Sequence, residues 1–261
     1  MTTPGGWSND FATGLKIGIL FCTRLPLPHP GPIEAGDVAR ASWAFPVAGA
    51  LVGGIGAIVY GGALEVGLTP PPAAALALAA TLAATGCLHE DGLADTADGF
   101  GGGRQRERKL EIMHDSRLGT YGACALVMSL VLRWAAAVAI ASPMPVALAL
   151  IAAHAAARAA LPAFMRFVPP ARPGGLSAQA GRPALRCVIV AALLGAAALG
   201  GALGLAAALT GLVLAASAWF FMAWLSVRQI GGHTGDVLGA LEQIVEIVIL
   251  LTAVAMRKVQ P

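Results

Sequence analysis

Long apolar stretches are the feature of this chain of 261 residues that most restricts its fold. They cover residues 43–64, 73–88, 121–140, 146–168, 188–207, 209–227 and 237–256. A helix needs roughly 20 apolar residues to cross the hydrocarbon core of a bilayer. Only 12% of the residues are charged, about half of the share in a typical soluble domain. The sequence therefore predicts an all-α polytopic bundle of about seven transmembrane helices, with residues 1–261 forming one integral membrane domain in the lipid bilayer.

The N-terminal 40 residues differ from the rest and are predicted to be an interfacial segment. Residues 11–24 are apolar but too short to span comfortably, which is typical of a helix lying at the membrane surface. Prolines then end any helix at Pro26, Pro28, Pro30 and Pro32. The polar start is not followed by an apolar core with a small-residue cleavage site, so we expect no cleavable signal peptide.

Basic residues are distributed unevenly between the two ends of the predicted spans. They occur before the first span, at 104–117 after the second and at 172–186 after the fourth, whereas the connections 69–72 and 142–145 have none. Cytoplasmic loops carry the excess of lysine and arginine, so these basic loops are predicted to face the cytoplasm. Arg257 and Lys258, after the seventh span, do not follow this pattern. The net charge of +3 is modest and does not indicate nucleic-acid binding.

Three aspartates follow the second apolar stretch. Asp91, Asp95 and Asp98 are spaced i, i+4 and i+7, so a helix would place them on one face. Three like charges need a counter-charge, and Mg²⁺ prefers carboxylate oxygens. Gly92 and Gly99 would let a substrate or another backbone approach closely. The alternative is a solvated helix end without chemistry. His89 and Glu90 are weaker candidates for this site. Glu90 would point about 100° away from the triad.

A basic segment follows the aspartates. A run of three glycines precedes closely spaced cations, which suits a diphosphate because arginine binds phosphate bidentately. The candidate phosphate ligands are Arg104, Arg106, Arg108 and Arg117, with Asp115 as a partner for Arg117. The alternative is an ordinary cytoplasmic loop, which would need the same cations. Residues 89–122 are therefore the predicted catalytic region.

The last predicted span also contains polar side chains. Asp236 and Gln243 share a face by helical spacing, although an acid at a helix start is also favourable for the helix dipole alone. Glu246 lies deep in the apolar stretch, where an unpaired charge is costly. It is either part of the site or half of a structural ion pair, for example with Arg133 or Arg158.

These motifs resemble a known family. H-x-D-G-L-A-D-T-x-D-G at 89–99, R-E-R-x-L-E-I-M at 106–113 and D-S-R-L-G-T-Y-G at 115–122 are similar to the cobalamin synthases, the adenosylcobinamide-GDP ribazoletransferases. The C-terminal T-G-D motif at 234–236 and F-C-T-R-L-P at 21–26 also resemble that family. Two positions depart from its pattern, because Glu90 stands where an apolar residue is usual and His114 where a basic residue is usual.

The resemblance implies a Mg²⁺-dependent transferase of cobalamin biosynthesis in the bacterial cytoplasmic (inner) membrane, with its active site facing the cytoplasm. It would join adenosylcobinamide-GDP and α-ribazole, or its 5′-phosphate, to give adenosylcobalamin, or its 5′-phosphate, and GMP. Carried onto this sequence, Asp91, Asp95 and Asp98 would hold the metal, and the arginines would hold phosphates. A carboxylate, Asp98 or Asp236, would accept the proton of the attacking hydroxyl.

Two other classes of function share part of this pattern. Aspartate-rich membrane prenyltransferases and CDP-alcohol phosphotransferases also bind Mg²⁺ and diphosphate, but the first need a second D-x-x-x-D-like cluster and the second an arginine after D-G-x-x-A. A cation transporter would instead favour acids in the middle of spans and a repeated pair of broken helices. The sequence leaves the oligomeric state open, a homo-oligomer included.

Overall fold

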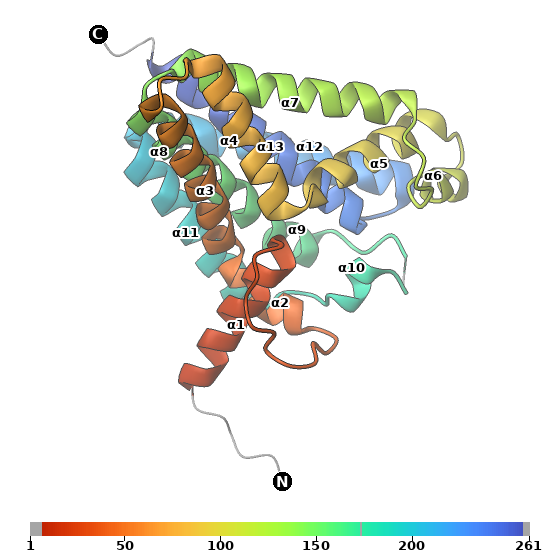
Figure 1. Cartoon of the computed structure of the whole chain (residues 1–261). Helices are drawn as coiled ribbons and strands as arrows, with labels where there is room; N and C mark the ends of the chain where they lie inside the picture. The colour runs from red at the N-terminus through yellow and green to blue at the C-terminus, as the bar shows by residue number, and fades with distance from the viewer. Residues whose placement is uncertain (1–6, 173, 258–261) are drawn as a thin grey trace.

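The computed structural model describes residues 7–172 and 174–257, and helices account for nearly all of the secondary structure in them (Figure 1). This part of the chain contains no β-strand, only an isolated bridge between Pro170 and His233. Six helical segments are long and apolar enough to cross a membrane, and a bent helix pair is a candidate for a seventh. The predicted all-α polytopic bundle of about seven spans is therefore confirmed.

The helices agree with the predicted apolar stretches to within a few residues at most ends. The predicted 121–140, for example, is the helix Thr120–Ile140. The long helices are α3 (Phe45–Glu65), α7 (Thr120–Ile140), α8 (Pro143–Ala159) continued by α9 (Leu161–Phe167), α11 (Leu185–Leu203), α12 (Leu205–Ile230) and α13 (Gly235–Arg257). The N-terminal segment forms α1 (Trp7–Cys22) and the short α2 (Asp37–Ala41).

The second apolar stretch is the one that bends. It forms α4 (Pro70–Thr85) and α5 (Leu88–Gly102), whose axes differ by 88°. Gly86 and Cys87 join them in the left-handed conformation, with φ of 64° and 57°. Two successive left-handed residues cannot continue a right-handed helix, so α4 ends there. The aspartates consequently lie on a separate helix that runs alongside α13 rather than on the end of α4.

Helix α13 lies in the centre of the bundle and packs against α5, α7, α8 and α12.

Small residues allow α3 and α8 to pack closely against each other. A Cβ on Gly49 of α3 would lie 2.1 Å from the carbonyl oxygen of His154 on α8. Helices in lipid associate largely through such close contacts, because the surrounding lipid tails are as apolar as the helices. The alanine and glycine of the sequence thus set how near the helices come.

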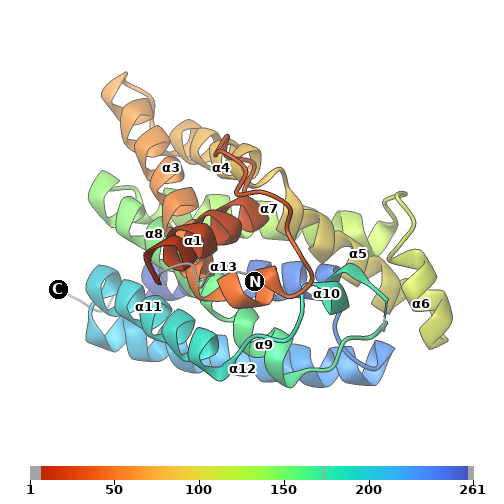
Figure 2. The ribbon, with the colours of Figure 1, turned by 90° about the horizontal axis from the view of Figure 1, so that it is seen from below.

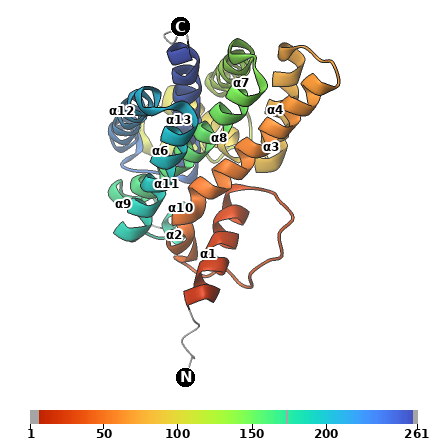
Figure 3. The ribbon, with the colours of Figure 1, turned by 90° about the vertical axis from the view of Figure 1, so that its left-hand side faces the viewer.

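The N-terminal helices and the last residues of α13 lie at opposite ends of the bundle. In Figure 3, α1 lies at the bottom and the end of α13 at the top. Figure 2 looks onto the lower end and shows α1, α2, α9 and α10 (Leu176–Gln179) there. At the opposite end, Arg257 donates a hydrogen bond of 2.9 Å to the carbonyl oxygen of Ile140, the last residue of α7. A cation beside a helix C-terminus is favourable, which accounts for a basic residue outside the basic loops.

Candidate active site

A cavity of about 770 Å³ opens between α5, α13 and the loops beside them. Its volume lies within the usual range of ligand sites, about 300 to 1,000 Å³. Asp91 and Asp95 of α5 line it together with Asp236 of α13. The α6–α7 loop and the loop after α9 complete its wall, with α6 covering Arg106–Ile112. The structure thus brings together carboxylates from two motifs that lie about 140 residues apart.

The crossing of α5 and α13 places these carboxylates side by side. A Cβ on Gly92 would lie 2.8 Å from the carbonyl oxygen of Asp236 and 3.2 Å from the Cα of Gly239. The close approach expected at Gly92 is therefore made by another backbone. Thr234 organises the start of α13, because its hydroxyl donates to a carboxylate oxygen of Asp236 at 3.1 Å and accepts the backbone N–H of Val237 at 3.3 Å.

Asp98 has different surroundings. Its two carboxylate oxygens accept the backbone N–H groups of Gly119 and Gly122 at 2.7 Å and 2.8 Å, where α7 begins. It lines a separate pocket of about 310 Å³ that also contains Arg117. The helical spacing put the three aspartates in one group, but the structure joins Asp91 and Asp95 with Asp236 and uses the Asp98 carboxylate to hold α7. The feature of the sequence that could have indicated this role is the pair of glycines at the start of α7, whose N–H groups the Asp98 carboxylate accepts.

Gly99, the second glycine expected to let a substrate or another backbone approach closely, is also packed against protein. A Cβ on it would lie 2.3 Å from the Cγ atom of Met113. It therefore lets the segment around α6 approach α5.

The four arginines predicted to bind phosphate do not line the aspartate cavity. Arg106 is the most firmly placed, because its guanidinium donates to the carbonyl oxygens of Ile230 at 2.8 Å and Ala171 at 2.5 Å. These bonds tie α6 to the end of α12 and to the loop after α9. Arg104 is exposed.

Arg108 and Arg117 are exposed and paired with acids. Arg108 contacts Glu111 at 3.0 Å, and Arg117 donates to Asp115 at 2.5 Å. The hydrogen bonds from Arg117 lower the pKa of Asp115 to about 2. Asp115 itself borders the aspartate cavity. The expected pairing of Asp115 with Arg117 is confirmed.

The basic side chains that do line the cavity are Arg172 and His114. Arg172 lies in the loop after α9, and sequence reasoning treated it only as part of a cytoplasmic basic loop. The same excess of arginine marks every such loop, so no signal in the sequence distinguished it.

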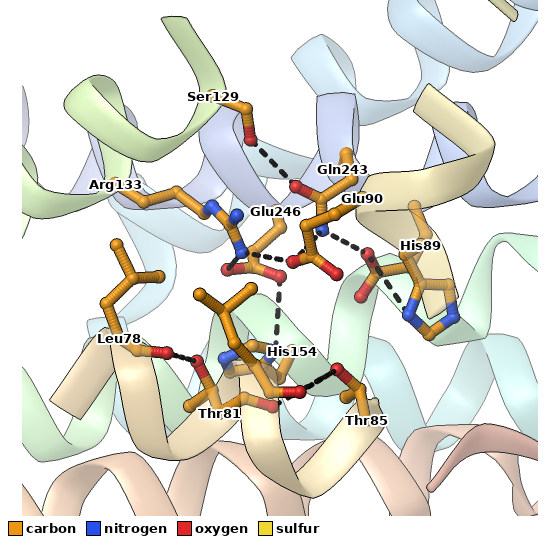
Figure 4. A network of polar contacts seen from close by, with 12 residues as sticks. Leu78, Thr81, Thr85, His89, Glu90, Ser129, Arg133, His154, Gln243 and Glu246 are labelled. Carbon is orange, nitrogen blue, oxygen red and sulfur yellow. Dashed lines mark hydrogen bonds and ion pairs between the residues drawn. The ribbon is translucent and has the colours of Figure 1, made fainter. Parts of the chain in front are cut away.

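A network of buried charged side chains connects α5, α7, α8 and α13 (Figure 4). Arg133 of α7 contacts Glu90 of α5 at 2.9 Å and Glu246 of α13 at 3.4 Å. His154 of α8 lies 3.1 Å from Glu246. All are buried. The structural ion pair considered for Glu246 is therefore present, and its partner is Arg133.

The network continues around Glu242, which pairs with Arg158 at 2.5 Å. His89 lies 3.4 Å from Arg158 through its Nδ1 atom. Gln243 connects both halves, because its amide nitrogen donates to Glu90 at 3.1 Å and to Glu242 at 3.0 Å. His89, Glu90, Gln243 and Glu246 consequently fasten α5 to α7, α8 and α13 and do not line the cavity.

Within the described residues, one group of three side chains has candidate metal ligands that all lie within 4.8 Å of one another: His154, Glu242 and Glu246. Arg133 and Arg158 already contact these carboxylates, so we interpret the group as an ion network. The cavity aspartates do not form so close a group. Mg²⁺ often binds through only one or two carboxylates, with waters and substrate phosphates as its other ligands.

Comparison with known proteins gives a consistent result. The family model described as cobalamin-5-phosphate synthase matches residues 14–254. The adenosylcobinamide-GDP ribazoletransferase of Bradyrhizobium diazoefficiens is 60% identical over 92% of this chain and 93% of its own. Those of Mesorhizobium japonicum and Azorhizobium caulinodans are 53% and 48% identical, over 92% and 88% of this chain and 92% and 91% of their own. No solved structure matches.

Both findings extend over nearly the whole chain and confirm the resemblance seen in the motifs. Together with the apolar helices, they show a membrane-embedded enzyme. The chain belongs to the cobalamin-5-phosphate synthase family.

Proposed function

We propose that this enzyme joins adenosylcobinamide-GDP to α-ribazole, or to its 5′-phosphate, and releases GMP. The product is adenosylcobalamin or its 5′-phosphate. The observation that carries the proposal is the convergence of Asp91, Asp95 and Asp236 on one cavity, in a chain 60% identical to a protein named for this transfer. A diphosphate donor needs such a site because its cleavage develops negative charge.

The metal proposed for the cavity is Mg²⁺, held by Asp91 and Asp95 with Asp236 facing them. These side chains offer only carboxylate oxygens, the ligands that Mg²⁺ prefers. Within the described residues, no ion pair joins any of the three to a basic side chain, so their charge calls for a cation. When bound, Mg²⁺ would offset the charge of the phosphates and of the leaving GMP.

Asp236 is the proposed general base. The ribazole hydroxyl would form a bond to the phosphorus nearer the cobinamide, and the bond from that phosphorus to the bridging oxygen would break, so that GMP leaves with this oxygen. Asp236 would take the hydroxyl proton, with Thr234 holding one of its carboxylate oxygens. Asp98 is less suited, because both of its oxygens already accept backbone hydrogen bonds.

The proposed location is the bacterial cytoplasmic membrane, with the cavity facing the cytoplasm. The α6 segment contains Arg106, Arg108 and Lys109, the segment between α9 and α11 contains Arg172 and Arg182, and both segments border the cavity. The positive-inside rule assigns that end of the bundle to the cytoplasm, where nucleotide substrates and Mg²⁺ are available.

The test is GMP release by the purified protein in detergent, with each substrate and Mg²⁺ omitted in turn. Asp91→Asn, Asp95→Asn and Asp236→Asn should each lower turnover by about a hundredfold or more. Glu65→Gln is the control, because Glu65 is exposed at the far end of α3. Wild-type protein that releases no GMP, but carries cations across a vesicle membrane, would instead support a transporter.

A further inference from the structure

The cavity lined by the aspartates is also lined by one side chain that is permanently cationic. Arg172 lines the same cavity as Asp91, Asp95 and Asp236, and its side chain is partly buried. No hydrogen bond or ion pair joins its guanidinium to another residue in the described part of the chain. The other arginines near the cavity are engaged, since Arg106 holds backbone carbonyls and Arg117 holds Asp115.

A guanidinium that lines a cavity without an ion-pair or hydrogen-bond partner is unusual. Arginine usually either pairs with an acid or extends its charged end into water. A bound anion would supply the missing partner. Arginine presents a planar fork of N–H donors that matches two oxygens of one phosphate. The nearby carboxylates would repel a bare phosphate, so the anion must be held by cations on both sides. A metal at the aspartates and Arg172 in the same cavity would form such a pair.

We propose that Arg172 is the phosphate ligand of this cavity, a role that sequence patterns assign to the arginines of the 104–117 segment. The inference rests on the proposed function. Phosphate could reach Arg172 from two sources, the diphosphate of the donor or the 5′-phosphate of the acceptor. Both offer the same oxygens to the guanidinium, so kinetics must distinguish them.

The experiment measures kcat and KM of Arg172→Ala, Arg172→Lys and Arg186→Ala with α-ribazole and with its 5′-phosphate as acceptors. Arg186 is the control for lost positive charge, because it is exposed at the start of α11 and lines none of the described cavities. We expect Arg172→Ala to lower kcat/KM by about tenfold to a hundredfold, the usual effect of losing a hydrogen bond to a charged group. Arg172→Lys keeps the charge without the fork and should lose less.

The pattern of losses identifies the phosphate. If the donor phosphate binds Arg172, Arg172→Ala raises the KM of adenosylcobinamide-GDP with either acceptor. GMP then inhibits the variant enzyme more weakly than the wild type, while inhibition by guanosine is unchanged. If the acceptor binds here, only reactions of the 5′-phosphate are impaired. Thermal unfolding should not change, because no hydrogen bond or ion pair of the Arg172 guanidinium holds another residue within the described ranges 7–172 and 174–257.

Two outcomes would overturn the proposal. The first is Arg172→Ala with wild-type kinetics for both acceptors and wild-type inhibition by GMP. The second is an equal loss in Arg186→Ala, which would mean that general surface charge is responsible. Either result leaves the proposed function intact as long as the wild-type protein releases GMP. A wild-type protein without that activity would remove the proposed function itself.

Discussion

Gly92 and Gly239 face each other at the crossing of α5 and α13, and neither position has room for a side chain. A Cβ on Gly92 would lie 3.2 Å from the Cα of Gly239, and a Cβ on Gly239 would lie 3.3 Å from the Cα of Gly92. Asp91 is the neighbour of one glycine, and Asp236 lies in the first turn of the helix that carries the other. The contact between the two glycines therefore sets the separation of the carboxylates across the cavity.

Replacing Gly92 with alanine should consequently lower turnover by about tenfold or more. The added Cβ would lie 2.8 Å and 3.0 Å from the backbone oxygen and Cα of Asp236, and backbone atoms cannot rotate away. The helices must separate, and a displacement of about 1 Å can reduce an enzymatic rate by a hundredfold. Gly54→Ala on α3 is the matched control, because its Cβ would meet no atom within 4 Å. Full activity of Gly92→Ala would show that the crossing tolerates expansion.

Asp98 and Asp95 should respond differently to the same substitution. Asparagine at 98 keeps the shape but places an NH₂ donor beside one of two backbone N–H groups. Leaving a buried donor unsatisfied costs about 1–3 kcal/mol, so Asp98→Asn should lower the unfolding temperature. Asp95→Asn should lower turnover without lowering that temperature, because the Asp95 carboxylate makes no hydrogen bond to any residue that the structure describes. Thermal unfolding in detergent, measured beside GMP release, separates the two. Unchanged stability in Asp98→Asn would contradict the structural role.

The span pattern could be predicted from the sequence because bilayer thickness and apolar length are directly related. The break between α4 and α5 could not. It depends on Gly86 and Cys87 both adopting left-handed φ, and a cysteine gives no such signal. Local periodicity correctly placed Asp91 and Asp95 on one helix face. It could not indicate that Asp236 completes the group, because that depends on how α5 and α13 cross.

The basic residues show a second limit of sequence patterns. Topology and phosphate binding both require arginine in the same loops. Only the structure shows that Arg106 holds the carbonyl oxygen of Ile230 while Arg172 lines the cavity. The buried ion pairs were easier to anticipate, because a charge such as Glu246 inside an apolar span must find a partner.

Removing divalent metal should abolish GMP release, and adding Mg²⁺ should restore it. The cavity carboxylates repel one another unless a cation is bound, so affinity for Mg²⁺ should depend on each of them. Asp95→Asn should raise the Mg²⁺ concentration for half-maximal rate by about tenfold, in the range of one charged interaction. Titration of turnover with Mg²⁺ after treatment with a chelator measures this. Turnover that persists in chelator would reject the metal and leave the transfer reaction standing.

In the buried network, we expect replacement of an acidic side chain and replacement of a basic side chain to affect stability differently. Glu90, Glu242 and Glu246 carry three negative charges, whereas Arg133 and Arg158 carry two positive ones. Removing a carboxylate therefore brings the charges of these five residues closer to balance, and removing a guanidinium increases the imbalance. Unpaired charge in a buried, apolar environment is strongly unfavourable.

Arg133→Met should accordingly destabilise the protein much more than Glu90→Gln. Loss of one partner from a buried pair costs about 3–5 kcal/mol, and Arg133→Met would leave both Glu90 and Glu246 without their guanidinium. Glu90→Gln still leaves Arg133 beside Glu246 at 3.4 Å. Arg228→Met is the control for the substitution itself, because Arg228 lies over the exposed ring of Trp224 at 5.3 Å. Thermal unfolding of the variants in one detergent gives the comparison. If Glu90→Gln unfolds at the lower temperature, charge balance does not govern this network, and the ion pair between Arg133 and Glu90 must contribute more than the relief of excess negative charge.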